Sequence, residues 1–262
     1  MLCYVSNTSP KVRDNVSPLH GDNRWELHMN DKYRWAAGRK IVLIHGAAAT
    51  SRIWRLVIAE LHVSLPYTRI LVPDRRCTGN MDKETDDLWE ACSGALVVGV
   101  SGGATLAWAL ASRKCPMLGM IAHEPAAGNL CPGLLSYAGS AWSESTLNPV
   151  RRATLFGERL YGTQWNADEL PSDVAAVSRD YRMFSQFNPA PPRINPSVIT
   201  LTIGALSPKI RYDAAQAYEQ TFGIPSHTLA GAKHCVQLEQ PRLFADVIAS
   251  HLLAATSKQS LA

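Results

Sequence analysis

The sequence lacks the features that mark membrane-spanning and nucleic-acid-binding proteins. Its longest apolar stretches, near residues 95–111 and 117–122, are broken by Gly, Ser, Arg or Lys before reaching the ~18 residues that a membrane span needs. No run of basic residues is interleaved with aromatics, and the formal net charge is only +4. We therefore expect neither a membrane nor nucleic acid among the partners.

Paired cysteines and a leader pattern are lacking as well. The six cysteines are scattered without any C-x-x-C pair, which is typical of a reducing compartment and argues against a disulfide framework or a zinc site. The first residues show no basic segment followed by an apolar block, which is the pattern of a secretory signal. These absences predict a cytoplasmic protein with no metal and no organic cofactor.

What the sequence does contain is an alternation of strand-like and helix-like segments. A chain of 262 residues, 46% hydrophobic, is long enough for one large α/β domain. A continuous apolar run, typical of a strand buried in a parallel sheet, occurs at 41–44, and further strand-like segments rich in apolar residues occur at 69–72, 96–100, 118–122 and 198–203. The alternation predicts a mostly parallel sheet with right-handed crossovers, flanked by helices, with reactive groups at the carboxyl ends of the strands. Before these runs, alternating apolar and polar residues over 25–35 predict an antiparallel hairpin.

Composition divides the chain into a lead-in, a core and an insertion. Residues 1–24 are polar and form the lead-in, while residues 25–125 and 193–262 carry the core alternation. Residues 126–192 instead carry aromatic side chains on helical patterns, so we expect a small helical lid over the strand ends. The segment 82–92 is short, and we expect a stunted helix there.

One apolar run ends at Gly99-Val100-Ser101-Gly102-Gly103, which has the pattern of a nucleophile elbow. Glycines two residues either side of Ser101 suit a sharp, strained strand-to-helix turn, because no side chain has room there. At such a turn the Ser101 hydroxyl stands clear of the sheet, and the Gly102 N–H points at whatever the serine attacks. The alternative interpretation is a small residue at an ordinary tight turn.

Three further motifs make the chain resemble the α/β-hydrolases from about residue 25 to 255. They are HGAAATSRIW after the first parallel strand, PDRRCTGN after the next, and GAKHCVQLEQP near the carboxyl end. The resemblance implies an α/β-hydrolase fold with the catalytic order Ser, acid, His, in which Ser101 is the nucleophile and His234 the base. It also implies an oxyanion hole built from the N–H groups of Ala47 and Gly102.

The resemblance gives structural roles to residues of the first two loops. It implies that His45 supports its loop through hydrogen bonds and that Asp74 is a structural loop residue. Cys77 stands where the family usually has a glycine, which predicts an altered shape for that loop.

The triad acid is absent from the place where most of these enzymes have it. The loop after residues 198–203 offers Ser207, and a serine cannot hold an imidazolium as a carboxylate does. Glu124 follows the strand next to the nucleophile's strand, from which it could reach His234. This arrangement resembles the lactone-opening α/β-hydrolases that act on zearalenone-type mycotoxins, whose acid lies in a His-Glu pair at the same point. The alternatives are Asp213 as the acid and a serine–histidine dyad that has no acid.

The aromatic, uncharged lid predicts a hydrophobic small-molecule substrate. We predict Trp165, Tyr181 and Phe184 as pocket walls, with packing as the alternative role for each. Together the motifs predict a serine hydrolase that opens an ester or lactone bond through a Ser-His-Glu triad and an acyl-enzyme. The alternatives are a carbon–carbon or amide hydrolase with the same triad and a non-catalytic ligand-binding protein of the same fold. The sequence leaves open whether the protein forms a homodimer.

Overall fold

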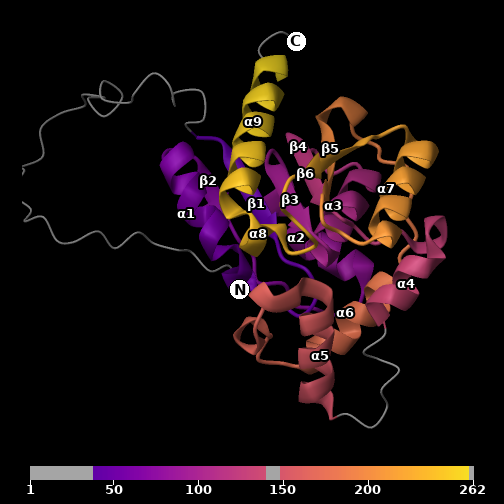
Figure 1. Ribbon diagram of the computed structural model, residues 1–262. Helices are drawn as coiled ribbons and strands as arrows, with labels where there is room; N and C mark the ends of the chain where they lie inside the picture. The colour runs from indigo at the N-terminus through magenta and orange to yellow at the C-terminus, as the bar shows by residue number, and fades with distance from the viewer. Residues whose placement is uncertain (1–37, 140–147, 260–262) are drawn as a thin grey trace, which may run out of the picture.

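The computed structural model describes residues 38–139 and 148–259 (Figure 1). Within them, six strands form one sheet in which every neighbouring pair is parallel. The strands are β1 (Lys40–Ile44), β2 (Arg69–Leu71), β3 (Leu96–Val100), β4 (Gly119–His123), β5 (Ile199–Gly204) and β6 (Ser226–Leu229). Their order is β2-β1-β3-β4-β5-β6, so the winding direction reverses between β1 and β3. Such a reversal opens a crevice at the carboxyl ends of the strands.

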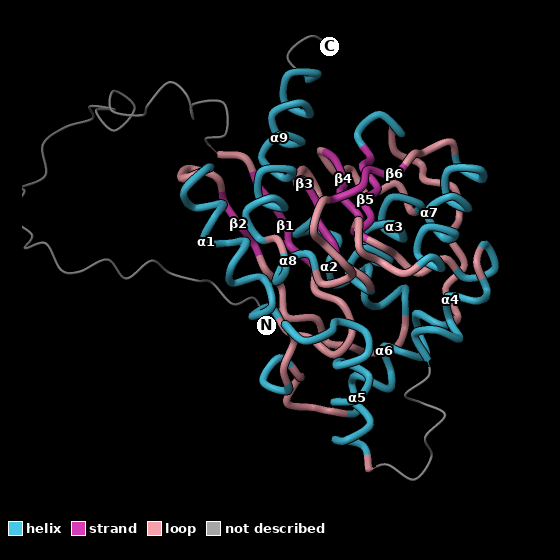
Figure 2. Tube along the Cα trace, in the orientation of Figure 1, coloured by secondary structure: helices cyan, strands magenta, loops and turns pink. Residues whose placement is uncertain are grey.

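Helices cover both faces of the sheet, which is why the central strands are apolar throughout (Figures 1 and 2). On one face lie α1 (Arg55–Ser64) and α9 (Pro241–Gln259), with α8 (Val236–Glu239) leading into α9. On the other lie α2 (Met81–Cys92), α3 (Gly102–Ser112) and α7 (Lys209–Phe222). Trp108 of α3 meets Tyr218 of α7 edge to face, with ring centroids 4.7 Å apart. No helix of the described chain has the length and apolarity that a membrane crossing requires.

The α2 helix corrects the expectation of a stunted helix before β3. It spans 12 residues, which matches the average of about 11–12 for globular proteins. Its first turn is stabilised by Asn80, whose side chain accepts a hydrogen bond from the Lys83 N–H at 3.0 Å, and by the acidic Asp82 and Glu84. The expected hairpin over 25–35 lies outside the described residues.

In the described part of the region expected to form a lid, three α-helices follow β4: α4 (Pro132–Ala138), α5 (Pro149–Tyr161) and α6 (Ala175–Ser185). Figure 2 shows α5 and α6 beyond the carboxyl ends of the strands, at the bottom of the view. The helices therefore lie over the edge of the sheet where the crevice opens.

A buried ionic cluster joins α6 to the core. Arg75, which follows β2, pairs with Glu84 of α2 at 3.1 Å and with Asp180 of α6, and all three side chains are at most 2% exposed. The same guanidinium donates to the carbonyls of His45 and Gly46, each at 3.1 Å. One cation thus holds α6, α2 and the loop after β1 together.

Replacing Asp180 with asparagine is expected to lower the free energy of unfolding by about 3 kcal/mol, because the Arg75 charge stays buried with one carboxylate removed. Urea-induced unfolding followed by circular dichroism measures the change. Asp173→Asn is the matched control, since Asp173 pairs with Arg179 at 2.6 Å on the surface and is 61% exposed. Equal midpoints for Asp180→Asn and the wild type would contradict the anchoring role.

Candidate active site

Ser101 lies in a strained turn between β3 and α3. Its backbone has φ 58° and ψ −122°, in a region that non-glycine residues rarely adopt. A Cβ atom on Gly99 would lie 2.3 Å from the Gly103 backbone, and one on Gly103 would lie 1.9 Å from the carbonyl oxygen of Ile44. The two glycines are therefore required by the close approach of β1, β3 and α3, as the elbow pattern predicted.

The sheet register brings Ser101 and Glu124 to neighbouring positions. Val100 pairs with His123 at the end of the β3–β4 ladder, so Ser101 and Glu124 are the residues that follow this pair. The Ser101 N–H donates to the His123 carbonyl at 2.9 Å, and the Glu124 N–H donates to the Thr202 carbonyl at 3.1 Å. Two strand ends thus present a hydroxyl and a carboxylate at the same edge of the sheet.

Glu124 and His234 form a buried pair. The Nδ1 atom of His234 lies 2.7 Å from Oε2 of Glu124, and both side chains are at most 6% exposed. The other carboxylate oxygen, Oε1, accepts hydrogen bonds from the Gly204 N–H at 3.0 Å and from the Ser207 hydroxyl. Ser207, which stands where the family resemblance led us to expect an aspartate, therefore binds the carboxylate that follows β4.

These contacts set the charge states of the pair. Burial alone would raise the pKa of Glu124, but the hydrogen bond from His234 and the Arg211 guanidinium lower it well below its usual range. Burial and the positive charge of Arg211 lower the pKa of His234 to about 4. At neutral pH a carboxylate thus accepts the Nδ1–H of a neutral imidazole, which leaves Nε2 as a proton acceptor.

The hydrogen bond between His234 and Ser101 that a catalytic triad requires is not made here. Nε2 of His234 instead accepts from Nη2 of Arg211, with 3.3 Å between the nitrogens. The Tyr161 ring stacks on His234 with 5.6 Å between centroids, and the nearby Ser101 side chain partly offsets the rise in the Tyr161 pKa that burial causes. The hydrogen bond between a nucleophile and its base is often long or poorly aligned in the free enzyme and shortens when substrate binds.

The two residues expected to supply oxyanion donors, Ala47 and Gly102, both line the cavity beside Ser101. Gly102 is the first residue of α3, where helix N–H groups have no partner within the helix. Ala47 faces the same cavity, and its carbonyl accepts a hydrogen bond from the Tyr161 hydroxyl at 2.6 Å. The Trp165 indole donates to the next carbonyl, that of Ala48, at 2.9 Å. Lid side chains thus fix the backbone that would hold an oxyanion.

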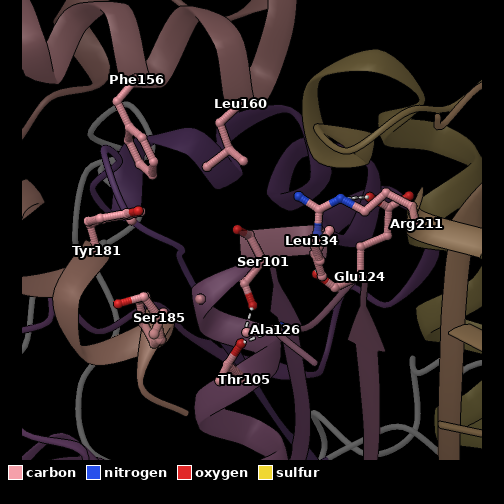
Figure 3. A pocket seen from close by; sticks show the side chains of 13 residues that line it. Ser101, Thr105, Glu124, Ala126, Leu134, Phe156, Leu160, Tyr181, Ser185 and Arg211 are labelled. Carbon is pink, nitrogen blue, oxygen red and sulfur yellow. Dashed lines mark hydrogen bonds and ion pairs between the residues drawn. The ribbon is translucent and has the colours of Figure 1, made fainter. Parts of the chain in front are cut away.

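A cavity opens over Ser101. Figure 3 shows Ser101 between an apolar wall from the lid and the pair Glu124 and Arg211 on the other side. The apolar lining comes from Leu134, Phe156, Leu160, Tyr181 and Phe184. The expectation for Tyr181 and Phe184 is met in position, whereas Trp165 is not among the lining residues because its indole lies behind the loop after β1.

His45 and Asp74, for which structural roles were expected, make no contact with Glu124 or His234 among the hydrogen bonds described. His45 bonds the Gly46 carbonyl through Nδ1 at 3.0 Å and accepts the Arg75 N–H at Nε2 at 3.3 Å, and burial lowers its pKa to about 3. Asp74 accepts the Ser51 N–H at 2.9 Å. Both therefore hold loop backbone.

The alternative acid, Asp213, lies at the surface. It is 39% exposed and pairs with Lys209 of the same helix at 2.6 Å.

Cys77, in the loop after β2, has φ 49°, which glycine adopts freely and cysteine does not, so this loop keeps a left-handed backbone without the glycine. Among the described residues, no group of three or more His, Cys, Asp or Glu is placed to hold a metal ion.

Two residues of the site were missed by sequence reasoning, Arg211 and Tyr161. α7 begins at Lys209 and carries Arg211 in its first turn, near the strand ends. Tyr161 is the last residue of α5. The signal that could have identified Arg211 is an arginine in the first turn of a helix that follows a strand end.

Comparison with known proteins identifies the family. The sequence model of the alpha/beta hydrolase family matches residues 41–247, so the chain belongs to this family. The comparison with curated proteins gives no match.

Several solved structures share the fold at low sequence identity. A thermophilic esterase from Thermogutta terrifontis is 17% identical, with a TM-score of 0.59 over 84% of this chain and 92% of that one. The carboxylesterase CesB from Bacillus subtilis is 15% identical, with a TM-score of 0.55 over 82% and 84%. Naproxen esterase from Bacillus subtilis is 16% identical, with a TM-score of 0.51 over 81% and 82%.

Proposed function

We propose that the protein is a serine hydrolase that cleaves an ester bond of a small molecule with apolar parts. The observation that carries the proposal is the buried pair of Glu124 and His234, 2.7 Å apart, beside a serine in a strained elbow. The apolar lid side of the cavity supports an apolar substrate portion. The esterases among the similar structures support ester chemistry, and a lactone, which is a cyclic ester, is the finer form of the proposal.

The reaction would begin with proton transfer from the Ser101 hydroxyl to Nε2 of His234 as Oγ attacks the ester carbonyl. The N–H groups of Ala47 and Gly102 stabilise the oxyanion, and such a donor typically contributes about 100-fold or more to the rate. His234 returns the proton to the leaving alcohol oxygen, which leaves an acyl group on Ser101. Water, deprotonated by the same Nε2, then releases the acid and restores the serine.

A second candidate is a ligand-binding protein without catalysis. It is favoured by one observation, the hydrogen bond from Arg211 to Nε2 of His234 at 3.3 Å, which takes up the atom that the base mechanism needs. In this case the cavity would bind a small molecule that stays intact.

A panel of matched esters, lactones and amides separates these candidates. The purified protein is expected to hydrolyse short 4-nitrophenyl esters and an aryl lactone, with the corresponding anilides at least about tenfold slower because the amine leaves less readily. Product formation is followed by absorbance and chromatography. A correctly folded protein that leaves the whole panel intact would favour the binding protein.

A further inference from the structure

Arg211 is a buried cation in the cavity that the proposed mechanism does not use. It is 5% exposed and lines the cavity together with Ser101 and Glu124 (Figure 3). Its Nη1 donates to the Glu124 carbonyl at 3.4 Å and its Nη2 to His234 at 3.3 Å. Its Nε is 3.3 Å from Glu124 Oε2 but makes no hydrogen bond with any described residue. A guanidinium has five N–H donors in a planar fork, so donors remain for a ligand.

This position opposes catalysis as long as the guanidinium keeps its present contacts. Its N–H occupies the Nε2 lone pair that must accept the Ser101 proton. Its charge also disfavours the imidazolium that forms in the transition state, because two cations would lie about 3 Å apart in a buried site. Glu124 alone must serve both groups, since its Oε2 is shared by His234 and Arg211. A productive complex needs a second anion beside Arg211.

We propose that the substrate is an ester carrying a carboxylate, which binds the Arg211 guanidinium and draws it away from Nε2 of His234. The proposal rests on the proposed hydrolase function and adds the substrate class. A carboxylate matches the fork geometry of arginine and supplies the missing negative charge. Arg211 is the only cation among the residues that line the cavity in the described chain, and the walls opposite are apolar. The substrate therefore combines a carboxylate at one end with an apolar portion against the lid.

Two matched substrate pairs test this assignment, and in each pair the carboxylate of one member is a methyl ester in the other. One pair is 4-nitrophenyl hydrogen adipate and its methyl ester, in which the carboxylate lies on the acyl side. The other is 4-acetoxybenzoate and its methyl ester, in which the carboxylate lies on the leaving group. We expect the wild type to hydrolyse at least one charged member with kcat/KM at least about tenfold above its neutral partner, as a charge-assisted hydrogen bond provides.

Arg211→Gln is expected to remove this preference, lowering the ratio of kcat/KM for the charged ester to kcat/KM for its neutral partner at least about tenfold. Arg211→Lys, which keeps the charge, should retain part of the preference. Lys209→Gln is the matched control, because it removes a cation from the same helix at a side chain that is 86% exposed. Circular dichroism and thermal unfolding identify variants that fail to fold.

The pH profile gives a second signature, which a merely structural arginine would not produce. His234 must be neutral to act as a base, so activity falls as pH falls through its pKa, which lies near 4 in the free protein. A carboxylate on Arg211 removes the opposing charge, so the acid limb of kcat should lie at higher pH than that of kcat/KM. The neutral esters should not show this separation.

The outcomes distinguish the two proposals. Equal kcat/KM for charged and neutral esters in the wild type would overturn the substrate class and leave the hydrolase standing. If the protein hydrolyses no member of either pair, the proposed hydrolase function is wrong. Thermal unfolding in the presence of adipate then decides whether Arg211 binds a carboxylate. Stabilisation by adipate in the wild type and Lys209→Gln but not in Arg211→Gln would retain Arg211 as a carboxylate site. No stabilisation in any of them would overturn that site too.

Discussion

Replacing Glu124 with glutamine is expected to lower kcat/KM for ester hydrolysis about 10³- to 10⁴-fold, as for loss of the carboxylate in other triads. One carboxylate oxygen accepts from His234, and the other accepts from Gly204 and Ser207. Whichever way the new amide turns, its NH₂ group meets a donor. If the NH₂ group faces His234, the imidazole must change its tautomer, which puts a proton on the nitrogen that should accept one. If it faces Gly204 and Ser207, two N–H donors oppose each other and the side chain is displaced from His234.

The same substitution is expected to destabilise the fold. Arg211 would lose its ionised partner while staying buried, which typically costs about 3–5 kcal/mol of unfolding free energy. Steady-state kinetics and urea-induced unfolding measure the two effects separately.

Asp213→Asn is the matched control for Glu124, because it neutralises the alternative acid at a side chain paired only with Lys209 among the contacts described. It should leave kcat/KM and the unfolding midpoint near the wild-type values. A large loss of activity in Asp213→Asn, with Glu124→Gln still active, would assign the acid to Asp213.

Ser101→Ala is expected to lower kcat by about 10⁴-fold or more, since removal of a triad nucleophile leaves only the oxyanion hole and binding. The backbone at Ser101 is set by Gly99 and Gly103 and by contacts of β1 and α3, none of which involves the hydroxyl. Alanine should therefore keep the fold, and thermal unfolding checks this. Hydrolysis by Ser101→Ala within about tenfold of the wild-type rate would exclude an acyl-enzyme on this residue.

The fold could be predicted because strand burial leaves a direct trace in the sequence. A strand covered on both faces must be apolar at every position, and the runs at 41–44, 96–100 and 118–122 have this property. Counting strands then predicted that Ser101 and Glu124 end neighbouring strands, which the register of β3 and β4 confirms. The length of α2 was misjudged because its cap at Asn80 was not recognised.

The site was predicted only where its residues end strands or follow a motif. Tyr161 and Arg211 reach the cavity from helices, and a helix pattern does not say which turn faces a distant loop. Trp165 shows the reverse error, because an aromatic residue of the lid was expected in the cavity but donates its indole N–H to the Ala48 carbonyl. Placement of these side chains depends on how α5, α6 and α7 pack, and sequence periodicity does not contain that information.

The most direct test of nucleophile activation is labelling with a fluorophosphonate, with the adduct located by mass spectrometry, because it needs no knowledge of the substrate. We predict rapid formation of a single adduct on Ser101, much slower formation in Glu124→Gln, and none in Ser101→Ala. A folded wild-type protein that forms no adduct at Ser101 would contradict nucleophile activation and leave the cavity as a binding site.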